Sequence, residues 1–473
     1  MINSYFVEQF KEIFGFAPTV EQSKTMEKLS DFILSGIRDE VFILRGYAGT
    51  GKTSLIGSLV KLMTLLNQKV ILLAPTGRAA KVFSLHAGHA AYTIHKKIYR
   101  ERAFVGEGGS FVLSDNTHQH TLFLVDEASM IANDGLSGSI FGTGRLLDDL
   151  ISYVYAGKGC RLLLIGDTAQ LPPVGETESP ALSSSTIGSY GLRVREADLT
   201  QVVRQANDSG ILSNATRLRQ LIADNLTQGL PRVRLKGFAD IRQLPGGELI
   251  ETLEQCYAHA GIDETMVICR SNKRANIYNN GIRNRILYRE EELSSGDVVM
   301  VAKNNYYWGK ELKEIDFIAN GDIAIVRRVR RERELYGFRF ADVILTLPDY
   351  DDTELEATII LDTLQSDTPA LPPDKSQTLF DAIMEDYADI PLKRDRLKKI
   401  KEDPYYNALQ LKYAYAVTCH KAQGGQWQHV FIDQGYMTDE MMTPDYFRWL
   451  YTAFTRATDT LYLVNLPDSQ IEE

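Results

Sequence analysis

A glycine-rich run between an apolar segment and a helical pattern carries the clearest chemistry in this sequence. The run is Gly46-Tyr47-Ala48-Gly49-Thr50-Gly51-Lys52-Thr53, and it follows residues 41–44 and precedes residues 54–60. Glycines here let several backbone N–H groups point into one concavity, and the start of a helix adds its positive dipole end. The alternative is a glycine-rich turn with a surface lysine. The order of strand, loop and helix favours a phosphate-binding loop, in which Lys52 reaches the β- and γ-phosphates and Thr53 holds Mg²⁺.

Two carboxylates follow a second apolar segment. Asp126 and Glu127 come directly after residues 122–125. In open α/β sheets, ligands bind at the carboxyl ends of the strands. Asp126 is suited to hold Mg²⁺ through its water shell, and Glu127 is suited to accept a proton from an attacking water. An acidic pair at a strand end is common, so this prediction depends on the phosphate loop in the same chain.

A third loop, Gly166-Asp167-Thr168-Ala169-Gln170-Leu171-Pro172-Pro173, follows the apolar residues 162–165. The neutral amide of Gln170 can donate to a γ-phosphate and accept from a lytic water. A turn built on Gly166 and Asp167 and stiffened by the two prolines is the structural alternative. The spacing alone does not decide between a sensor and a turn.

Composition bounds the class of protein. The chain has 473 residues, 44% hydrophobic and 24% charged, which is typical of a globular protein and predicts three or four domains. A net charge of −10 argues against coating nucleic acid by bulk attraction. Two basic runs, residues 327–331 and 393–401, are either solvated faces or nucleic-acid contacts. Isolated cysteines and the lack of a membrane-length apolar stretch or signal peptide predict a cytoplasmic setting without membrane contact.

Apolar segments alternate with helical or loop segments in both halves of the chain. The segments are 41–44, 70–73, 122–125 and 162–165, then 266–269, 413–417, 430–432 and 461–464. Continuous apolar runs of this kind suit buried parallel sheets in doubly wound α/β domains. Short strands at 297–301, 322–326 and 341–345 predict a small antiparallel barrel inserted into the second domain. Residues 376–401 form a charged, amphipathic helical pattern of unassigned role.

The motifs in order resemble those of superfamily 1 helicases. The glycine-rich loop, the acidic pair and the Gln170 loop are similar to motifs I, II and III, and further motifs are matched by residues 199–205 (IV), 418–424 (V) and 450–457 (VI). Pro172-Pro173 and His420-Lys421-Ala422-Gln423-Gly424 point to the RecD/Dda branch, superfamily 1B. The resemblance covers residues 16–460 and implies two RecA-like P-loop domains with a small hairpin insertion and an SH3-like β-barrel insertion. The expected boundaries are 1–205, with the hairpin at about 99–120, then 206–293, 294–372, 373–410 and 411–473.

The resemblance implies an ATP site, with Mg²⁺, between the two α/β domains. Arg204 and Arg456 would reach the γ-phosphate, unless they form ordinary interdomain salt bridges. Gln22 matches a glutamine that reads adenine, although Thr19-x-x-Gln22 is also a capping box for the following helix. The residues expected at the nucleotide or its metal are Gln22, Gly46, Gly49, Thr50, Gly51, Lys52, Thr53, Ser54, Asp126 and Gly424. Catalytic roles are expected for Lys52, Glu127, Gln170, Arg204 and Arg456.

The resemblance also implies contacts with single-stranded DNA and with junctions between single and double strands. Small hydroxyl and backbone donors suit sequence-independent phosphate contacts. The residues expected there are Thr76, Thr93, His95, Thr418 and His420, while Gly424 would allow close approach of a phosphate. His95 has a structural hydrogen-bonding role as its alternative. In the hairpin, Phe104 or Phe111 would stack on the junction base pair as a strand-separating pin, or else pack against its own domain.

The expectation is an ATP-hydrolysing DNA helicase that moves on single-stranded DNA, 5′→3′ from the resemblance alone. Repair, recombination or replication is the expected setting, with unidentified protein partners. Two alternatives stay open at this point: an ATPase translocase that remodels complexes without unwinding, and a non-catalytic subunit of a repair complex. The motifs grip the backbone and do not themselves distinguish DNA from RNA.

Overall fold

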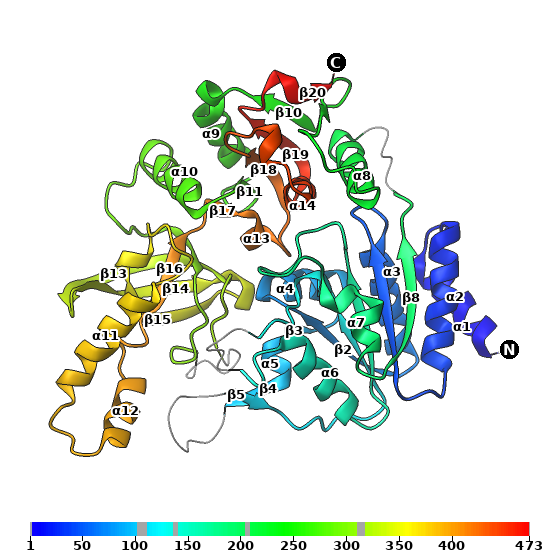
Figure 1. Ribbon diagram of the computed structural model, residues 1–473, viewed down its shortest axis with the longest axis horizontal. Helices are drawn as coiled ribbons and strands as arrows, with labels where there is room; N and C mark the ends of the chain where they lie inside the picture. Colours follow the sequence, from blue (N-terminus) through cyan, green and yellow to red (C-terminus); the bar gives the residue numbers. More distant parts are fainter. Residues whose placement is uncertain (1, 102–110, 136–140, 204–208, 310–316, 473) are drawn as a thin grey trace.

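Two α/β domains and a β-barrel make up the chain (Figure 1). The computed structural model describes residues 2–101, 111–135, 141–203, 209–309 and 317–472. The first domain carries the N-terminus, the second carries the C-terminus, and the barrel lies beside both with two helices at its outer end. The expected α/β class with a barrel insertion is confirmed.

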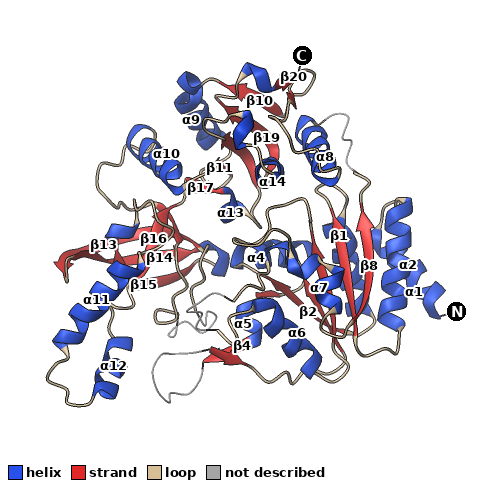
Figure 2. Cartoon of the chain, in the orientation of Figure 1, coloured by secondary structure: helices blue, strands red, loops and turns tan. Residues whose placement is uncertain are grey.

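The first domain is built on a six-stranded parallel sheet (Figure 2). Its strand order is β3-β2-β6-β7-β1-β8. The strands are β1 (Glu40–Gly46), β2 (Lys69–Ala74), β3 (Ala91–Thr93), β6 (Thr121–Val125), β7 (Arg161–Gly166) and β8 (Arg193–Leu199). Because β6, β7 and β1 are neighbours, the loops after them meet at one edge of the sheet.

Alternating residues of these strands are buried on both faces of the sheet. Phe42 and Leu44 face one apolar cluster, whereas Val41 and Ile43 face another. The first cluster is covered by α1 (Ile2–Phe14), α2 (Val20–Leu34), α3 (Lys52–Leu65) and α4 (Gly77–Ala87). The second is covered by α5 (Ile94–Ile98), α6 (Leu146–Ala156) and the segment at α7 (Ser184–Gly188). Burial on both faces explains the continuous apolar runs in the sequence.

The second domain has a five-stranded parallel sheet of order β10-β19-β18-β11-β17. Its strands are β10 (Ile241–Leu244), β11 (Thr265–Cys269), β17 (Ala416–Thr418), β18 (Trp427–Asp433) and β19 (Ala457–Val464). Its helices are α8 (Gly210–Ala223), α9 (Leu249–His259), α10 (Asn272–Arg285), α13 (Cys419–Ala422) and α14 (Pro444–Phe454). Two short strands, β9 (Val233–Arg234) and β20 (Ile471–Glu472), pair beside it.

The barrel closes through a strand that lies far along the chain. Its strands are β12 (Val298–Val301), β13 (Ile323–Leu335), β14 (Phe338–Leu347), β15 (Thr353–Ile360) and β16 (Leu409–Tyr413). The last strand lies past residue 372, where the sequence placed the end of the barrel. The expected strand 413–417 is divided, since Tyr413 ends β16 and Ala416 begins β17. A continuous apolar run hides this crossover because both strands are buried.

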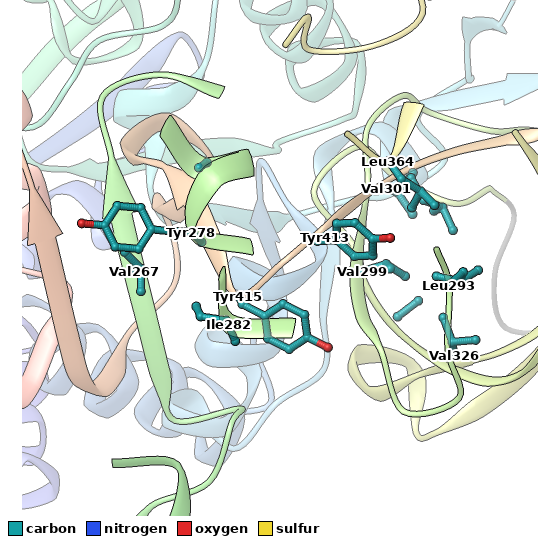
Figure 3. Close-up of a cluster of buried hydrophobic side chains, with 14 of the residues drawn as sticks. Val267, Tyr278, Ile282, Leu293, Val299, Val301, Val326, Leu364, Tyr413 and Tyr415 are labelled. Carbon is teal, nitrogen blue, oxygen red and sulfur yellow. The ribbon is translucent and has the colours of Figure 1, made fainter. Parts of the chain in front are cut away.

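The barrel and the second domain share one hydrophobic core. Val267 and Tyr278 of the second domain belong to the same buried cluster as Val299 and Val326 of the barrel. Tyr413 and Tyr415, on either side of the crossover, lie between the two groups (Figure 3). The two units are therefore packed together over a wide apolar contact.

The charged segment between β15 and β16, where the sequence predicted a helical pattern over 376–401, forms two helices. These are α11 (Pro373–Asp386) and α12 (Lys393–Lys401). Pro391 lies between them and cannot continue a helix from the preceding turn. Leu379, Ile383 and Ile400 pack on the barrel residues Phe338 and Phe340, so both helices are fixed to the barrel's outer end.

The hairpin insertion is represented by β4 (Tyr99–Glu101) and β5 (Phe111–Leu113), which pair antiparallel. Residues 102–110, including Phe104, lie outside the described residues. Over the described chain, no helix is both long enough and apolar enough to cross a membrane. All four cysteines are buried and free.

Candidate nucleotide site and nucleic-acid interface

The glycine-rich loop connects β1 to α3 as the sequence predicts. Gly49 and Gly51 have φ of 75° and 82°, in the left-handed region that glycine adopts without strain. Lys52 is the first residue of α3, and its ammonium donates to the carbonyls of Gly46 and Tyr47, the latter at 2.9 Å. Thr50 is buried and its hydroxyl also donates to the Tyr47 carbonyl, at 2.8 Å. The loop thus holds its lysine beside free helix N-terminal donors, an arrangement suited to phosphate.

The acidic pair lies at the end of β6, next to this loop. Glu127 adopts a left-handed conformation (φ 52°), and its N–H donates to Asp126 Oδ1 at 2.9 Å. Burial, and then the charge of Glu127, raise the pKa of Asp126 to about 6, while nearby Lys52 opposes the shift. Among the described residues neither carboxylate forms an ion pair. Two hard oxygen donors without a cationic partner, together with the half-buried Thr53, fit Mg²⁺ held jointly by protein and phosphate.

Gln170 is held in the loop after β7, close to the second domain. Its side chain is 6% exposed, and its Oε1 is buried without a protein partner. Asp167 shapes the loop by accepting from Ala169 N–H at 2.9 Å. A buried amide oxygen without a partner is costly, so this atom is available to accept a hydrogen bond from a water.

The two arginines differ in what the structure shows. Arg204 lies outside the described residues, but the N–H of its neighbour Val203 donates to the Gly49 carbonyl at 2.9 Å. Arg456 is buried, and its guanidinium donates to the carbonyls of Thr452 and Gly425 at 3.1 and 3.2 Å. These bonds are within the second domain, and no bond to the phosphate loop is seen among the described residues. Reaching a γ-phosphate would require Arg456 to exchange these carbonyls for the phosphate.

Gln22, near the start of α2, connects that helix to the phosphate loop. The capping box is confirmed, since Gln22 N–H donates to Thr19 Oγ1 at 3.2 Å and Thr19 N–H donates to Gln22 Oε1 at 3.0 Å. Its Nε2 donates to the Thr50 carbonyl at 3.0 Å. A β-carbon at Gly51 would lie 2.7 Å from that nitrogen, which explains the glycine. Both amide atoms are therefore engaged by the protein, and adenine contact stays a prediction. Ser54, one residue beyond the P-loop threonine, is exposed.

Gly424 lies at the boundary between the two domains. A β-carbon at this position would lie 3.0 Å from Ala79 Cβ and 3.3 Å from Thr76 Oγ1 of the first domain, while its expected contact with the nucleotide or a phosphate stays a prediction. Its φ of 75° also favours glycine. Close approach of two protein segments accounts for this glycine.

The expected hydroxyl contacts lie at helix starts. Thr76 and Thr93 are the N-caps of α4 and α5, and each accepts an N–H at 3.2 Å, from Ala79 and Lys96 respectively. Thr418 precedes α13 with its side chain not used as a cap, and His420 is exposed on that helix. Thr76 at the start of α4 and Gly424 just after α13 approach each other across the domain boundary, where Figure 1 shows α4 and α13 as neighbours.

His95 and Phe111 lie in an aromatic cluster. The ring of His95 lies 4.8 Å from that of Phe141 and 6.4 Å from that of Phe317, and burial lowers the pKa of His95 to about 4. The ring of Phe111 lies 4.9 Å from Phe141 and 4.5 Å from Tyr306. Phe111 therefore packs against its own surroundings, and His95 is packed among aromatic rings and neutral at pH 7, while a contact of either residue with DNA stays a prediction. The cluster links the hairpin base to the segment that follows β12.

A lysine pocket that no sequence motif predicts lies beside Thr418. The pocket lies between α10, β16 and α13, and Lys412 and Lys421 contribute to its lining. Burial lowers the pKa of each lysine to about 8, and the charge of Lys412 adds to the shift of Lys421. Lys412 donates to the carbonyls of Thr363 and Ser366, and Lys421 to Asn320 Oδ1. Two ammonium groups without a carboxylate in ion-pair contact, over the described residues, suit an anion.

Known proteins match the chain along most of its length. An AAA domain model matches residues 17–229, and a UvrD-like helicase C-terminal domain model matches residues 413–464. The uncharacterized protein R530 of Acanthamoeba polyphaga mimivirus is 23% identical, over 93% of this chain and 98% of that protein. The ATP-dependent RecD2 DNA helicase of Deinococcus radiodurans is 25% identical, over 93% of this chain but 48% of its own length. A structure of two Pif1 helicases on forked double-stranded DNA is 16% identical with a TM-score of 0.49, covering 97% of this chain and 94% of that one.

Proposed function

The chain belongs to the superfamily 1B helicases of the RecD/Dda/Pif1 type, and from this premise we propose that it is an ATP-dependent DNA helicase that moves 5′→3′ on single-stranded DNA. One observation carries the proposal. The phosphate loop, the acidic pair and the Gln170 loop follow the adjacent strands β1, β6 and β7, and the second domain is hydrogen-bonded to the last of these loops. A nucleotide bound at this edge of the sheet would contact all three loops, and its hydrolysis could change the position of the second domain through the Gln170 loop.

ATP would lie against the phosphate loop. Lys52 and the α3 N-terminus would bind its phosphates, while Thr53 and Asp126 would hold Mg²⁺, which neutralises charge on the transferred group. Glu127 would accept the proton of the attacking water, and Gln170 would orient that water. Arg204 and Arg456 would reach the γ-phosphate when the second domain closes. Loss of the γ-phosphate would release them, so that closure and opening follow hydrolysis.

Single-stranded DNA would cross both domains at the boundary where Thr76 and Gly424 meet. Thr76 retains its hydroxyl proton as a donor, and Thr93 can contribute in the same way. On the second domain, Thr418, His420 and the lysine pocket would bind successive phosphates. Repair or replication proteins are proposed partners.

A translocase that does not separate strands is the second candidate. The packing of Phe111 against Phe141 and Tyr306 favours it, because a ring held in that cluster is not free to stack on a base pair.

The decisive experiment measures ATP hydrolysis with and without single-stranded DNA, together with unwinding of duplexes that bear a 5′ or a 3′ tail. Stimulated hydrolysis with opening of the 5′-tailed duplex alone supports the proposal. Opening of the 3′-tailed duplex alone would show movement in the 3′→5′ direction and contradict the proposed polarity. Stimulated hydrolysis without opening of either duplex would favour the translocase. Absence of hydrolysis contradicts both candidates.

Lys52→Ala tests the site itself. We expect hydrolysis to fall roughly 100-fold or more, the size of losing one fixed donor to developing charge, without loss of the fold. Lys61→Ala is the matched control, since Lys61 is an exposed lysine on the same helix, α3. Steady-state turnover and thermal melting check both variants. Normal turnover in Lys52→Ala would refute the site.

A further inference from the structure

The Gln170 loop is attached to the second domain by a set of hydrogen bonds. Leu171 N–H donates to Thr452 Oγ1 at 2.9 Å, and its carbonyl accepts from Gln423 Nε2 at 2.8 Å. Arg448 donates to the Thr168 carbonyl at 2.6 Å. Thr452 and Arg448 lie on α14, the helix that ends two residues before Arg456. The loop is therefore fastened to the helix that presents the expected arginine.

Tyr451, on the same helix, extends this attachment to the phosphate loop. Its hydroxyl donates to Asp167 Oδ2 at 2.6 Å and accepts from the backbone N–H of Ala48 at 3.0 Å. The side chain is 1% exposed. Burial, and then the Asp167 carboxylate, hold the pKa of Tyr451 well above its ordinary value, so the phenol is neutral and can serve as donor and acceptor at once.

This single hydroxyl joins three functional segments. Ala48 belongs to the phosphate loop, Asp167 shapes the turn that carries Gln170, and Tyr451 comes from the second domain. The hydrogen bonds to Asp167 are buried and the one from Ala48 is partly buried, and in such surroundings a hydrogen bond is both stronger and more costly to lose than in water. If the backbone of the phosphate loop moves at Ala48, the Tyr451 hydroxyl that accepts from it must move as well. Because the same hydroxyl donates to Asp167, the Gln170 turn is displaced with it.

We propose that Tyr451 is a positioning residue that couples the phosphate loop to the Gln170 turn and to docking of the second domain. The proposal rests on the function proposed above, since it concerns how nucleotide binding is relayed to the DNA-gripping domain. Tyr451 does not touch the reacting atoms; it acts through Ala48 on one side and through Asp167 and Gln170 on the other. Its loss should uncouple the domains more than it weakens binding of either ligand.

Tyr451→Phe removes only the hydroxyl. We expect the stimulation of ATP turnover by single-stranded DNA to fall about tenfold, while KM for ATP and the affinity for single-stranded DNA without nucleotide stay within about threefold of the original. Tyr446→Phe is the matched control: Tyr446 is buried on the same helix, and its hydroxyl donates to Gln434 Oε1 at 2.6 Å, within the second domain. Stimulation retained in Tyr451→Phe, or lost equally in Tyr446→Phe, would overturn the proposal.

A second readout separates this proposal from the function itself. Hydrogen exchange of residues 167–171 is measured with and without ADP, which requires neither turnover nor DNA. The original protein should show slower exchange in this loop when ADP is bound, and Tyr451→Phe should not. Equal protection in both proteins would overturn the role of Tyr451. If the original protein neither hydrolyses ATP nor responds to DNA, the proposed function fails, and the exchange result alone decides the coupling.

Discussion

At the scale of single residues, burial makes the ionised form of Asp126 unfavourable when no cation is bound beside it. Its pKa is raised to about 6, chiefly by burial. An aspartate in the unfolded chain ionises at about pH 3.9. Between these values the folded protein binds more protons than the unfolded chain, so the free energy of unfolding falls as the pH rises from about 4 to about 6. Above that range the full cost of an ionised Asp126 is present.

Asp126→Asn should therefore stabilise the nucleotide-free protein while abolishing hydrolysis. The expected gain at pH 7.5 is ~1–3 kcal/mol, from a shift of about two pKa units. It should vanish below about pH 3, where the original aspartate is protonated in both the folded and the unfolded state. Thermal melts at the two pH values check this, with the exposed Asp134→Asn as control. A gain that does not depend on pH would contradict the assignment.

At the scale of elements, the lysine pocket arises because three segments converge. β16 supplies Lys412, α13 supplies Lys421, and the N-terminal turn of α10 lines the same pocket. The lowered pKa of both lysines means that their ammonium groups are lost as the pH rises through about 8. A bound phosphate would favour the charged forms, so affinity for an anion should be higher at pH 7 than at pH 9.

Lys412→Met should weaken binding of single-stranded DNA by about three- to tenfold and reduce the salt dependence by about 0.7 in the log–log slope, the value for one phosphate contact. Its affinity should also fall less than that of the original protein between pH 7 and pH 9. Fluorescence anisotropy measures both effects, over a salt series for the slope and at pH 7 and pH 9 for the change in affinity. Lys375→Met, which removes an exposed lysine of α11, is the control. Equal slopes in the two variants would exclude the pocket from the DNA path.

At the scale of the whole molecule, the domain boundary depends on close approach between α4 and the turn after α13. Gly424 permits that approach, because a β-carbon there would crowd Ala79 and Thr76 at 3.0 and 3.3 Å. The barrel also contacts α4, where Lys81 donates to the Pro348 carbonyl at 2.6 Å and lies 3.5 Å from Asp349. The second domain and the barrel therefore both contact the first domain at α4.

Gly424→Ala should impair closure of the domains. The left-handed backbone alone costs about 1 kcal/mol, and the clash with α4 adds to it. Gly435→Ala is a close control, because Gly435 has φ of 70° but no atom within 4 Å of a β-carbon. In chemical denaturation both variants should lose the backbone cost, with a further loss in Gly424→Ala from the contact with α4, whereas only Gly424→Ala should lose about tenfold in DNA-stimulated turnover. Equal turnover would show that the approach is not needed.

The sequence predicted those parts of the fold that depend on local pattern. Continuous apolar runs marked strands buried on both faces, and the glycine-rich loop and Thr19 capping box are set by neighbours in sequence. Strand β8 was missed because it alternates polar and buried residues at the sheet edge. The surroundings of Phe111 could not be predicted, since Phe141 and Tyr306 are distant in sequence. The same holds for Lys412, Lys421 and the hydroxyl of Tyr451, whose partners come from other elements.

The crossover from β16 to β17 limits how the protein can be taken apart. Only residues 414 and 415 separate the two strands, and the apolar core continues across them. The barrel consequently cannot be exchanged by replacing the chain between two loops. Its removal would expose the apolar core that it shares with the second domain and would remove Lys412. Any chimera that transplants a barrel from a relative must carry β16, β17 and the apolar surface beneath them as one piece.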